Sequence, residues 1–382
     1  MTSRPLESPR PGAGGGLRRV LAAWAQVFPA RRVALGLREM SAPSLTFILI
    51  GVALGPYATG ILRPDLLLRM DVVVSVALAA LGVFIGLGLA SFRMRGQAPL
   101  LLAALVEVAL TFLVVSVALY LLLTRWAMPL STGPWLFASV LGICASASAA
   151  VHAPGKGTAG RVGRLVDLDD APLVALATLA VGVAGGAPLL QGVVIAVVAG
   201  LGVGLAGWLL FERAQGEAER GVFVAGAIAL LGGVGAYGGT SPLLCGAVAA
   251  IVWKRASGGA DRIIRADLGK LQHPLVALLL IVAGASVRFD LALAWVAIPL
   301  VLLRLTGKLI ASTVAARLCV VPPGLLATVL LPPGVLGVAI ALNVQQVLGV
   351  GDTLLLSAAT VMTALSEPLS ALLVPREAEA ST

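Results

Sequence analysis

Long uninterrupted apolar runs fill almost the whole chain, and they constrain its fold more than any other feature. Each run has roughly 18 or more residues, which is enough for a helix to cross about 30 Å of hydrocarbon. With 59% hydrophobic and 12% charged residues, a chain of 382 residues has more apolar surface than one globular core can bury. The runs are continuous rather than alternating, which disfavours a β-barrel. The sequence therefore predicts an all-α, polytopic membrane protein.

The apolar runs predict about twelve transmembrane helices between residues 42 and 374. A basic segment, 1–41, is expected to be disordered or to lie on the membrane surface, and 375–382 form a short tail. Basic residues gather in alternate loops, so both termini are expected on the cytoplasmic side. Helices 3 to 5 and 10 to 12 then run in opposite senses and are expected to form an inverted repeat. The predicted spans are 43–63, 71–91, 98–123, 134–153, 165–186, 188–211, 221–238, 240–254, 273–288, 291–316, 325–348 and 353–374.

The net charge of +9 does not point to a nucleic-acid partner. The positive residues lie in short loops and at the N-terminus, as the positive-inside rule requires, and no basic patch is interleaved with aromatic residues. The three cysteines, Cys144, Cys245 and Cys319, lie inside or at the ends of apolar runs and are expected to be small core residues. No disulfide framework is predicted.

Two adjacent carboxylates, Asp169 and Asp170, stand at the head of an apolar run. An ionised carboxylate at the bilayer centre costs roughly 2.5 to 3.5 kcal/mol, so a buried pair is expected to bind a cation, a proton or both. The alternative is a helix cap, since Asp is a good N-cap and Pro172 suits a first helical turn. If the helix instead starts near Arg161 or Arg164, the pair lies two turns inside it.

Few other polar residues interrupt the predicted helices. Glu107 sits in the middle of helix 3, either as a hydrogen-bonded packing residue or as part of an ion path. Arg304 and Lys308 lie four positions apart in helix 10 and therefore share one face. A buried basic residue needs an acidic partner, and the Asp pair is the candidate.

Two of the predicted helices contain residues that interrupt a helix. Helix 4 has a run of small residues with Ser146 and Ser148, and helix 11 has Leu331-Pro332-Pro333-Gly334, followed by Asn343. Interruptions at corresponding positions of two halves predict discontinuous helices 4 and 11 around a site at the bilayer midplane. Ser146, Ser148 and Gly334 are possible ligands there, and Glu107 and Asn343 are possible accessory residues.

These motifs resemble the sodium/hydrogen exchanger domain of the monovalent cation:proton antiporter superfamily, in its Kef-type bacterial branch. The likeness covers most of 42–374 and includes the motifs at 51–56, 145–149 and 168–170. It implies a membrane antiporter that exchanges Na⁺ or K⁺ for protons, not an enzyme, and needs no other cofactor. It also implies a homodimer in the bacterial inner membrane. By this resemblance Asp170 binds the cation or protons, and Asp169 is its partner facing Arg304 or Lys308.

Three other functions are compatible with parts of the sequence. A sodium-coupled symporter of organic anions with a similar fold would also use broken helices. A transport-dead scaffold is the second, because Ala147 and Ser148 replace the acid and proline usual at the crossing of this family. An intramembrane aspartyl protease is the third, suggested by 349–352 with Asp352, but its Tyr-Asp partner motif is missing.

Overall fold

The computed structural model describes residues 43–90, 98–128, 130–149, 158–186, 188, 190–214, 216–256, 260–349 and 353–373. Its regular elements are all α-helices, which confirms the predicted helical class for this part of the chain. The helices are α2 (Pro43–Leu54), α3 (Pro64–Arg69), α4 (Asp71–Ala90), α5 (Ala98–Trp126), α6 (Pro134–Ser146), α7 (Thr158–Ala184), α8 (Gln191–Arg213), α9 (Glu217–Tyr237), α10 (Pro242–Ala256), α11 (Ala260–Ala285), α12 (Leu291–Cys319), α13 (Pro323–Leu330), α14 (Val335–Leu348) and α15 (Thr353–Leu373). The predicted N-terminal segment, the C-terminal tail and Asp352 lie outside the described residues.

Most helix boundaries follow the apolar runs, but several predicted spans differ. Two helices begin earlier than predicted: α7 at Thr158 instead of 165, and α11 at Ala260 instead of 273. The first predicted span, 43–63, ends as a helix at Leu54, because Gly55 and Pro56 interrupt it. The predicted span 134–153 is helical only to Ser146. The predicted span 325–348 is divided into α13 and α14 around the two prolines, which cannot donate a backbone hydrogen bond.

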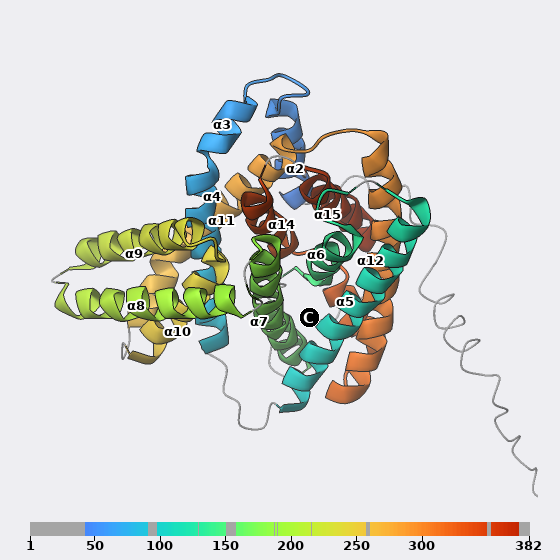
Figure 1. Cartoon of the computed structure of the whole chain (residues 1–382). Coiled ribbons are helices and arrows are strands. Elements are labelled where there is room, and N and C mark those ends of the chain that lie inside the picture. Colours follow the sequence, from blue (N-terminus) through green and yellow to red (C-terminus); the bar gives the residue numbers. More distant parts are fainter. Residues whose placement is uncertain are drawn as a thin grey trace, which may run out of the picture.

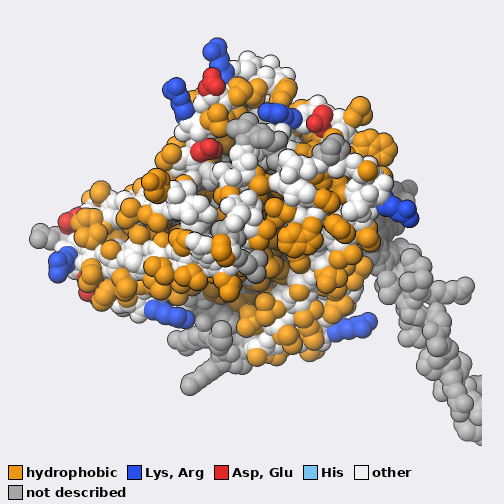
Figure 2. Space-filling view, viewed as in Figure 1, with side chains coloured by type: hydrophobic (Ala, Val, Ile, Leu, Met, Phe, Trp, Pro, Cys, Tyr) orange, Lys and Arg blue, Asp and Glu red, His pale blue; other side chains and the backbone are white. Residues whose placement is uncertain are grey.

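Six helices within the described residues are long and apolar enough to cross a membrane: α4, α5, α8, α9 (from Ala218), α12 and α15. Their outer faces carry apolar side chains at helical spacing, as on α8, where Val194, Val198, Leu201 and Leu205 are all exposed. On the face in Figure 2, charged side chains gather near helix ends and loops, while hydrophobic side chains cover the flanks between them. A surface of this kind suits lipid, and the protein is a multi-pass membrane protein.

The helices form two units, shown in Figure 1. We call α4 and α8–α10 the scaffold unit, because they share one apolar cluster that includes Leu231, Ala249 and Trp253. We call α5–α7 and α12–α15 the crossing unit, in which α5 and α12 pack along each other. Helices α2 and α11 pack together and connect the two units on one side.

Candidate functional site

Two short non-helical segments, with extended backbone at Ala147 and Gly334, meet in the middle of the crossing unit, and we call them the extended segments. One segment, 147–149, follows the end of α6, and the other, 331–334, connects α13 to α14. Ser148 and Pro333 form an antiparallel bridge. Ala149 N donates to Pro332 O over 3.0 Å, and Gly334 N donates to Ala147 O over 3.4 Å. Each segment therefore satisfies backbone groups of the other, as irregular backbone inside a membrane protein must.

Glycine is required where these segments approach most closely. A Cβ atom on Gly334 would overlap the carbonyl oxygen of Ser148, so a larger residue would push the segments apart. Gly334 thus takes part in the site through its backbone rather than as a side-chain ligand.

Arg304 of α12 holds both extended segments. Its guanidinium is fully buried and donates to Leu331 O over 2.7 Å and to Ala147 O over 3.1 Å. These two carbonyls belong to the residues that cap the C-terminal ends of α13 and α6. Because the C-terminal end of a helix carries a partial negative charge, a buried cation between two such ends is well placed electrostatically.

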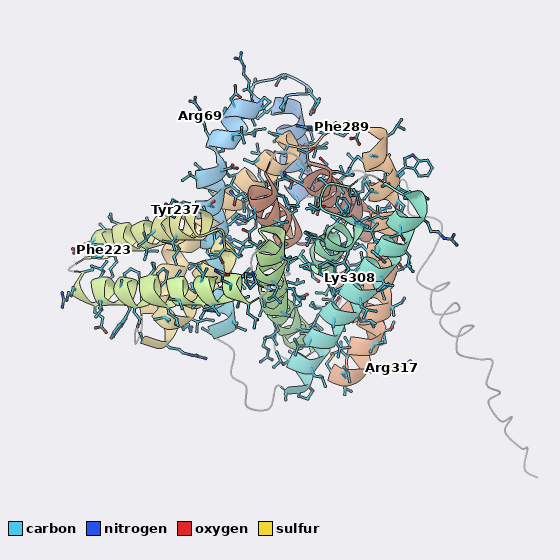
Figure 3. The ribbon with its side chains drawn as sticks, in the orientation of Figure 1. Arg69, Phe223, Tyr237, Phe289, Lys308 and Arg317 are labelled. Atoms are coloured by element: carbon cyan, nitrogen blue, oxygen red, sulfur yellow. The ribbon has the colours of Figure 1, made fainter. Side chains whose placement is uncertain are left out.

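Lys308 lies one turn further along α12, deep in the bundle between the levels of Arg69 and Arg317 (Figure 3). Its Nζ donates to Glu107 Oε1 over 2.8 Å, to Ser148 Oγ over 2.7 Å and to the carbonyl oxygen of Ser146. Lys308 and Glu107 are both fully buried. An ammonium group has three donors, so these contacts use all of them.

The carboxylate of Glu107 is only partly satisfied. Its Oε1 also accepts from the hydroxyl of Thr111 over 3.2 Å, on the next turn of α5. Its Oε2 is buried and has no hydrogen-bond partner among the described residues. Glu107 is therefore the counter-ion of Lys308 and keeps one free acceptor.

The Asp pair lies inside α7, which begins at Thr158 and contains Pro172 as a tolerated internal proline. The helix-cap alternative is therefore wrong, since Asp169 is roughly three turns from the start of the helix. Asp169 is fully buried, and neither carboxylate oxygen has a hydrogen-bond partner among the described residues. Asp170 is only partly buried.

The observed pairing differs from the expected one. Arg304 bonds to backbone carbonyls, and Lys308 pairs with Glu107, so neither forms an ion pair with Asp169. The helix-end carbonyls take one donor from each terminal nitrogen of Arg304, and Glu107, Ser146 and Ser148 take the three donors of Lys308. The sequence signal for the Lys308–Glu107 pair is that each of the two charged residues lies in the middle of an apolar run. The role of Thr111 and of the Ala147 and Leu331 carbonyls was not anticipated.

The remaining predicted site residues are distributed between two places. Ser146 and Ser148 lie at the crossing, but the backbone oxygen of Ser146 and the hydroxyl oxygen of Ser148 both accept hydrogen bonds from Lys308. Asn343 lies elsewhere: its Nδ2 donates to the hydroxyl of Ser241, just before α10, over 2.8 Å. Asn343 thus connects the crossing unit to the scaffold unit rather than contacting the Asp pair.

Comparison with known proteins gives information about the fold. The sequence matches no protein-family model and no curated protein. A solved structure of the sodium proton antiporter MjNhaP1 from Methanocaldococcus jannaschii at pH 8 is similar, with a TM-score of 0.60. The likeness covers 94% of this chain and 96% of the antiporter, at 14% sequence identity. Over nearly its whole length, the chain therefore has the fold of a sodium proton antiporter.

Proposed function

We propose that the protein is a secondary-active antiporter, which exchanges a monovalent cation for protons by alternating access. One observation carries the proposal. The Asp169 carboxylate is buried and accepts no hydrogen bond from the described residues, and it lies next to the partly exposed Asp170 in an apolar helix. A fully buried carboxylate without hydrogen-bond partners is costly when ionised, so the pair calls for a proton or a cation. The antiporter fold supports this assignment.

In this mechanism Asp170 is the exchanging carboxylate, because it is the member of the pair that remains partly exposed. Asp169 carries a proton in the conformation described, since Lys308 is occupied by Glu107. A proton and a cation compete for Asp170, so binding one requires release of the other, and no covalent step is needed. Arg304 and Lys308 hold the crossing while this exchange takes place.

Several finer features belong to the same proposal. The extended segments at 147–149 and 331–334 are the breaks of two discontinuous helices in an inverted repeat of a chain with about twelve spans. The transported cation is Na⁺ or K⁺, and the protein is a Kef-type homodimer in the bacterial inner membrane with both termini in the cytoplasm. Movement of the crossing unit against the scaffold unit provides alternating access.

The test is proton flux in proteoliposomes with Na⁺, K⁺ and Li⁺ added in turn. We expect a cation-driven pH change with at least one cation, which Asp170→Asn abolishes. Asp65→Asn, a matched control on exposed helix α3, should leave the flux unchanged. Flux that persists in Asp170→Asn, or its absence with every cation in the unsubstituted protein, contradicts the proposal. Na⁺-dependent uptake of an organic anion without proton counterflow would favour a symporter instead.

A further inference from the structure

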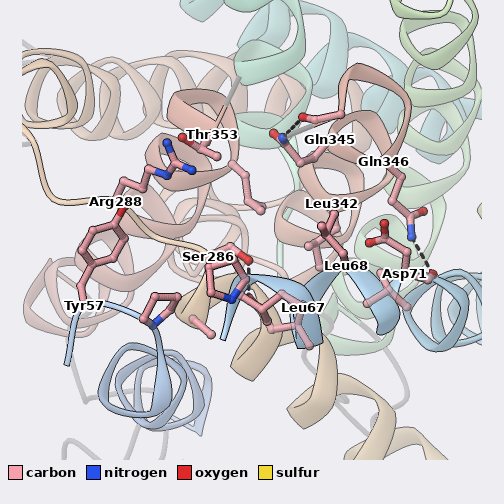
Figure 4. A pocket seen from close by; sticks show the side chains of 17 residues that line it. Tyr57, Leu67, Leu68, Asp71, Ser286, Arg288, Leu342, Gln345, Gln346 and Thr353 are labelled. Carbon is pink, nitrogen blue, oxygen red and sulfur yellow. Dashed lines mark hydrogen bonds between the residues drawn. The ribbon is translucent and has the colours of Figure 1, made fainter. Parts of the chain in front are cut away.

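A cavity of about 180 Å³ opens where the crossing unit meets α2, α3, α4 and α11 (Figure 4). It is lined from one side by residues such as Tyr57 and Asp71, and from the other by Gln345, Gln346 and Thr353. It lies at the same end of the molecule as α3, far from Arg317 (Figures 1 and 3). The charge pattern of the loops predicts that this end faces away from the cytoplasm.

Two side chains on the cavity wall, those of Asp71 and Gln345, carry acceptor oxygens available to a ligand. Asp71 is exposed at the start of α4, so its carboxylate is open to solvent in the cavity. The Oε1 atom of Gln345 is buried and has no hydrogen-bond partner within the described part of the chain. A buried oxygen is normally paired, so the free Gln345 Oε1 beside a water-sized space calls for a cation or for its hydration water, and the open Asp71 carboxylate adds negative charge there.

The cavity wall is held in place by one hydrogen-bonded contact between the two units. Gln346 Nε2, on α14, donates to the backbone oxygen of Asp71 over 2.8 Å and lies 3.1 Å from Ser75 Oγ, both on α4. Figure 4 shows the contact with Asp71 as a dashed line beside that carboxylate. The bond fixes the position of Asp71 on the cavity wall and leaves its side chain free to bind.

We propose that this cavity is an outer vestibule that binds the monovalent cation before it reaches the Asp pair. The inference rests on the proposed antiport. Asp71 supplies the charge, Gln345 supplies an oxygen ligand, and water completes the shell, as expected for a hard cation with oxygen ligands. Arg288 lines the opposite end of the cavity (Figure 4) and limits the net negative charge. Binding is therefore weak enough for the cation to move on.

The deeper wall of the vestibule is apolar. Val74 and Leu342 are buried and line the cavity about one turn beyond Asp71 and Gln346 along their helices. A desolvated cation does not pass between packed apolar side chains, so the vestibule is closed toward the interior in this conformation. A cation bound in the vestibule therefore reaches the Asp pair only after the crossing unit moves.

The test uses sealed vesicles in which the cation is added either from the vestibule face or from the opposite face. With the cation at the vestibule face, we expect Asp71→Asn to raise the half-saturating cation concentration about fivefold, with little change in maximal rate. Gln345→Leu should raise it about twofold to threefold. Asp65→Asn removes the same charge from α3, outside the cavity, and should change it by less than about twofold.

With the cation added from the opposite face, Asp71→Asn should match the unsubstituted protein, which a general loss of folding would not produce. An unchanged half-saturation in Asp71→Asn, or an equal change in Asp65→Asn, overturns the vestibule while the antiport stands. Unsubstituted protein that exchanges no cation overturns the antiport and the vestibule together.

Discussion

In the scaffold unit, α4 and α10 approach so closely that a Cβ atom on Gly82 or Gly246 would overlap the facing backbone. In the crossing unit, α5 and α12 are instead joined by a buried ion pair between Glu107 and Lys308. One unit is held by close backbone contact, and the other by charge and hydrogen bonds. In lipid, where burying apolar surface gives little driving force, both are effective ways to associate helices.

The difference between the units indicates where proton coupling can act. The close contacts of Gly82 and Gly246 between α4 and α10 are with backbone atoms, which do not titrate. The contacts at the crossing include the ion pair between Glu107 and Lys308, which depends on the charges of both groups. Under the proposed antiport, a proton that binds at the crossing acts on the crossing unit rather than on the glycine contacts between α4 and α10. The predictions below probe this contrast, starting with the largest expected effect.

Removal of Lys308 should have the largest effect on stability. In Lys308→Met, the carboxylate of Glu107 stays buried without its counter-ion, and the expected loss is about 3–5 kcal/mol. Thermal unfolding in detergent, followed by tryptophan fluorescence, measures the change. The double variant Glu107→Gln/Lys308→Met should recover most of the loss, because no unpaired charge remains. A double variant as unstable as Lys308→Met would show that the ion pair is not the cause.

Tight packing in the scaffold unit should be the next most sensitive feature. Gly246→Ala places a methyl group against the carbonyl of Ala79, and overpacking of this kind costs about 1–3 kcal/mol. Gly202→Ala, on α8, is the matched control because the space around its Cβ position is open. The same unfolding measurement should separate the two variants. Equal stability for both would mean that α4 and α10 can move apart freely.

The sequence predicts most of the fold because the apolar runs set helix positions directly. The span predicted at 71–91 is observed as Asp71–Ala90. The interruption at 331–334 follows from Pro332 and Pro333, which no regular helix accommodates in succession. The first span was predicted too long because its hydropathy continues past Gly55 and Pro56, although the helix does not.

The site was only partly predictable, because it depends on which helices become neighbours. Local sequence identifies Asp169, Glu107 and Lys308 as polar residues in apolar runs. It does not show that Lys308 pairs with Glu107, which is 201 positions away in the chain, rather than with Asp169. Nor does it show that Arg304 is used to hold two helix ends, since those carbonyls belong to backbone that any residue would supply.

Replacement of the Arg304 guanidinium by a single ammonium group should have a moderate effect on stability. In Arg304→Lys the charge remains, but one group cannot easily bond both Leu331 O and Ala147 O. We expect a loss of about 1.5–2 kcal/mol, near the lower range for a hydrogen bond to a charged group. Unfolding gives this value, and Arg317→Lys at the exposed end of α12 is the control. A loss no larger than the control's would mean that the charge alone holds the crossing.

The smallest expected effect concerns the hydrogen bond between Asn343 and Ser241, one of those that join the two units. Asn343 donates to Ser241 over 2.8 Å within a buried contact, and loss of a neutral hydrogen bond costs about 1 kcal/mol. Asn343→Ala and Ser241→Ala should each lose about that amount, and the double variant should lose little more, since both remove the same interaction. Unfolding of the three variants closes a double-mutant cycle. Strictly additive losses would show that the two side chains act separately. Coupling would instead identify this bond as one that must break if the crossing unit moves against a rigid scaffold.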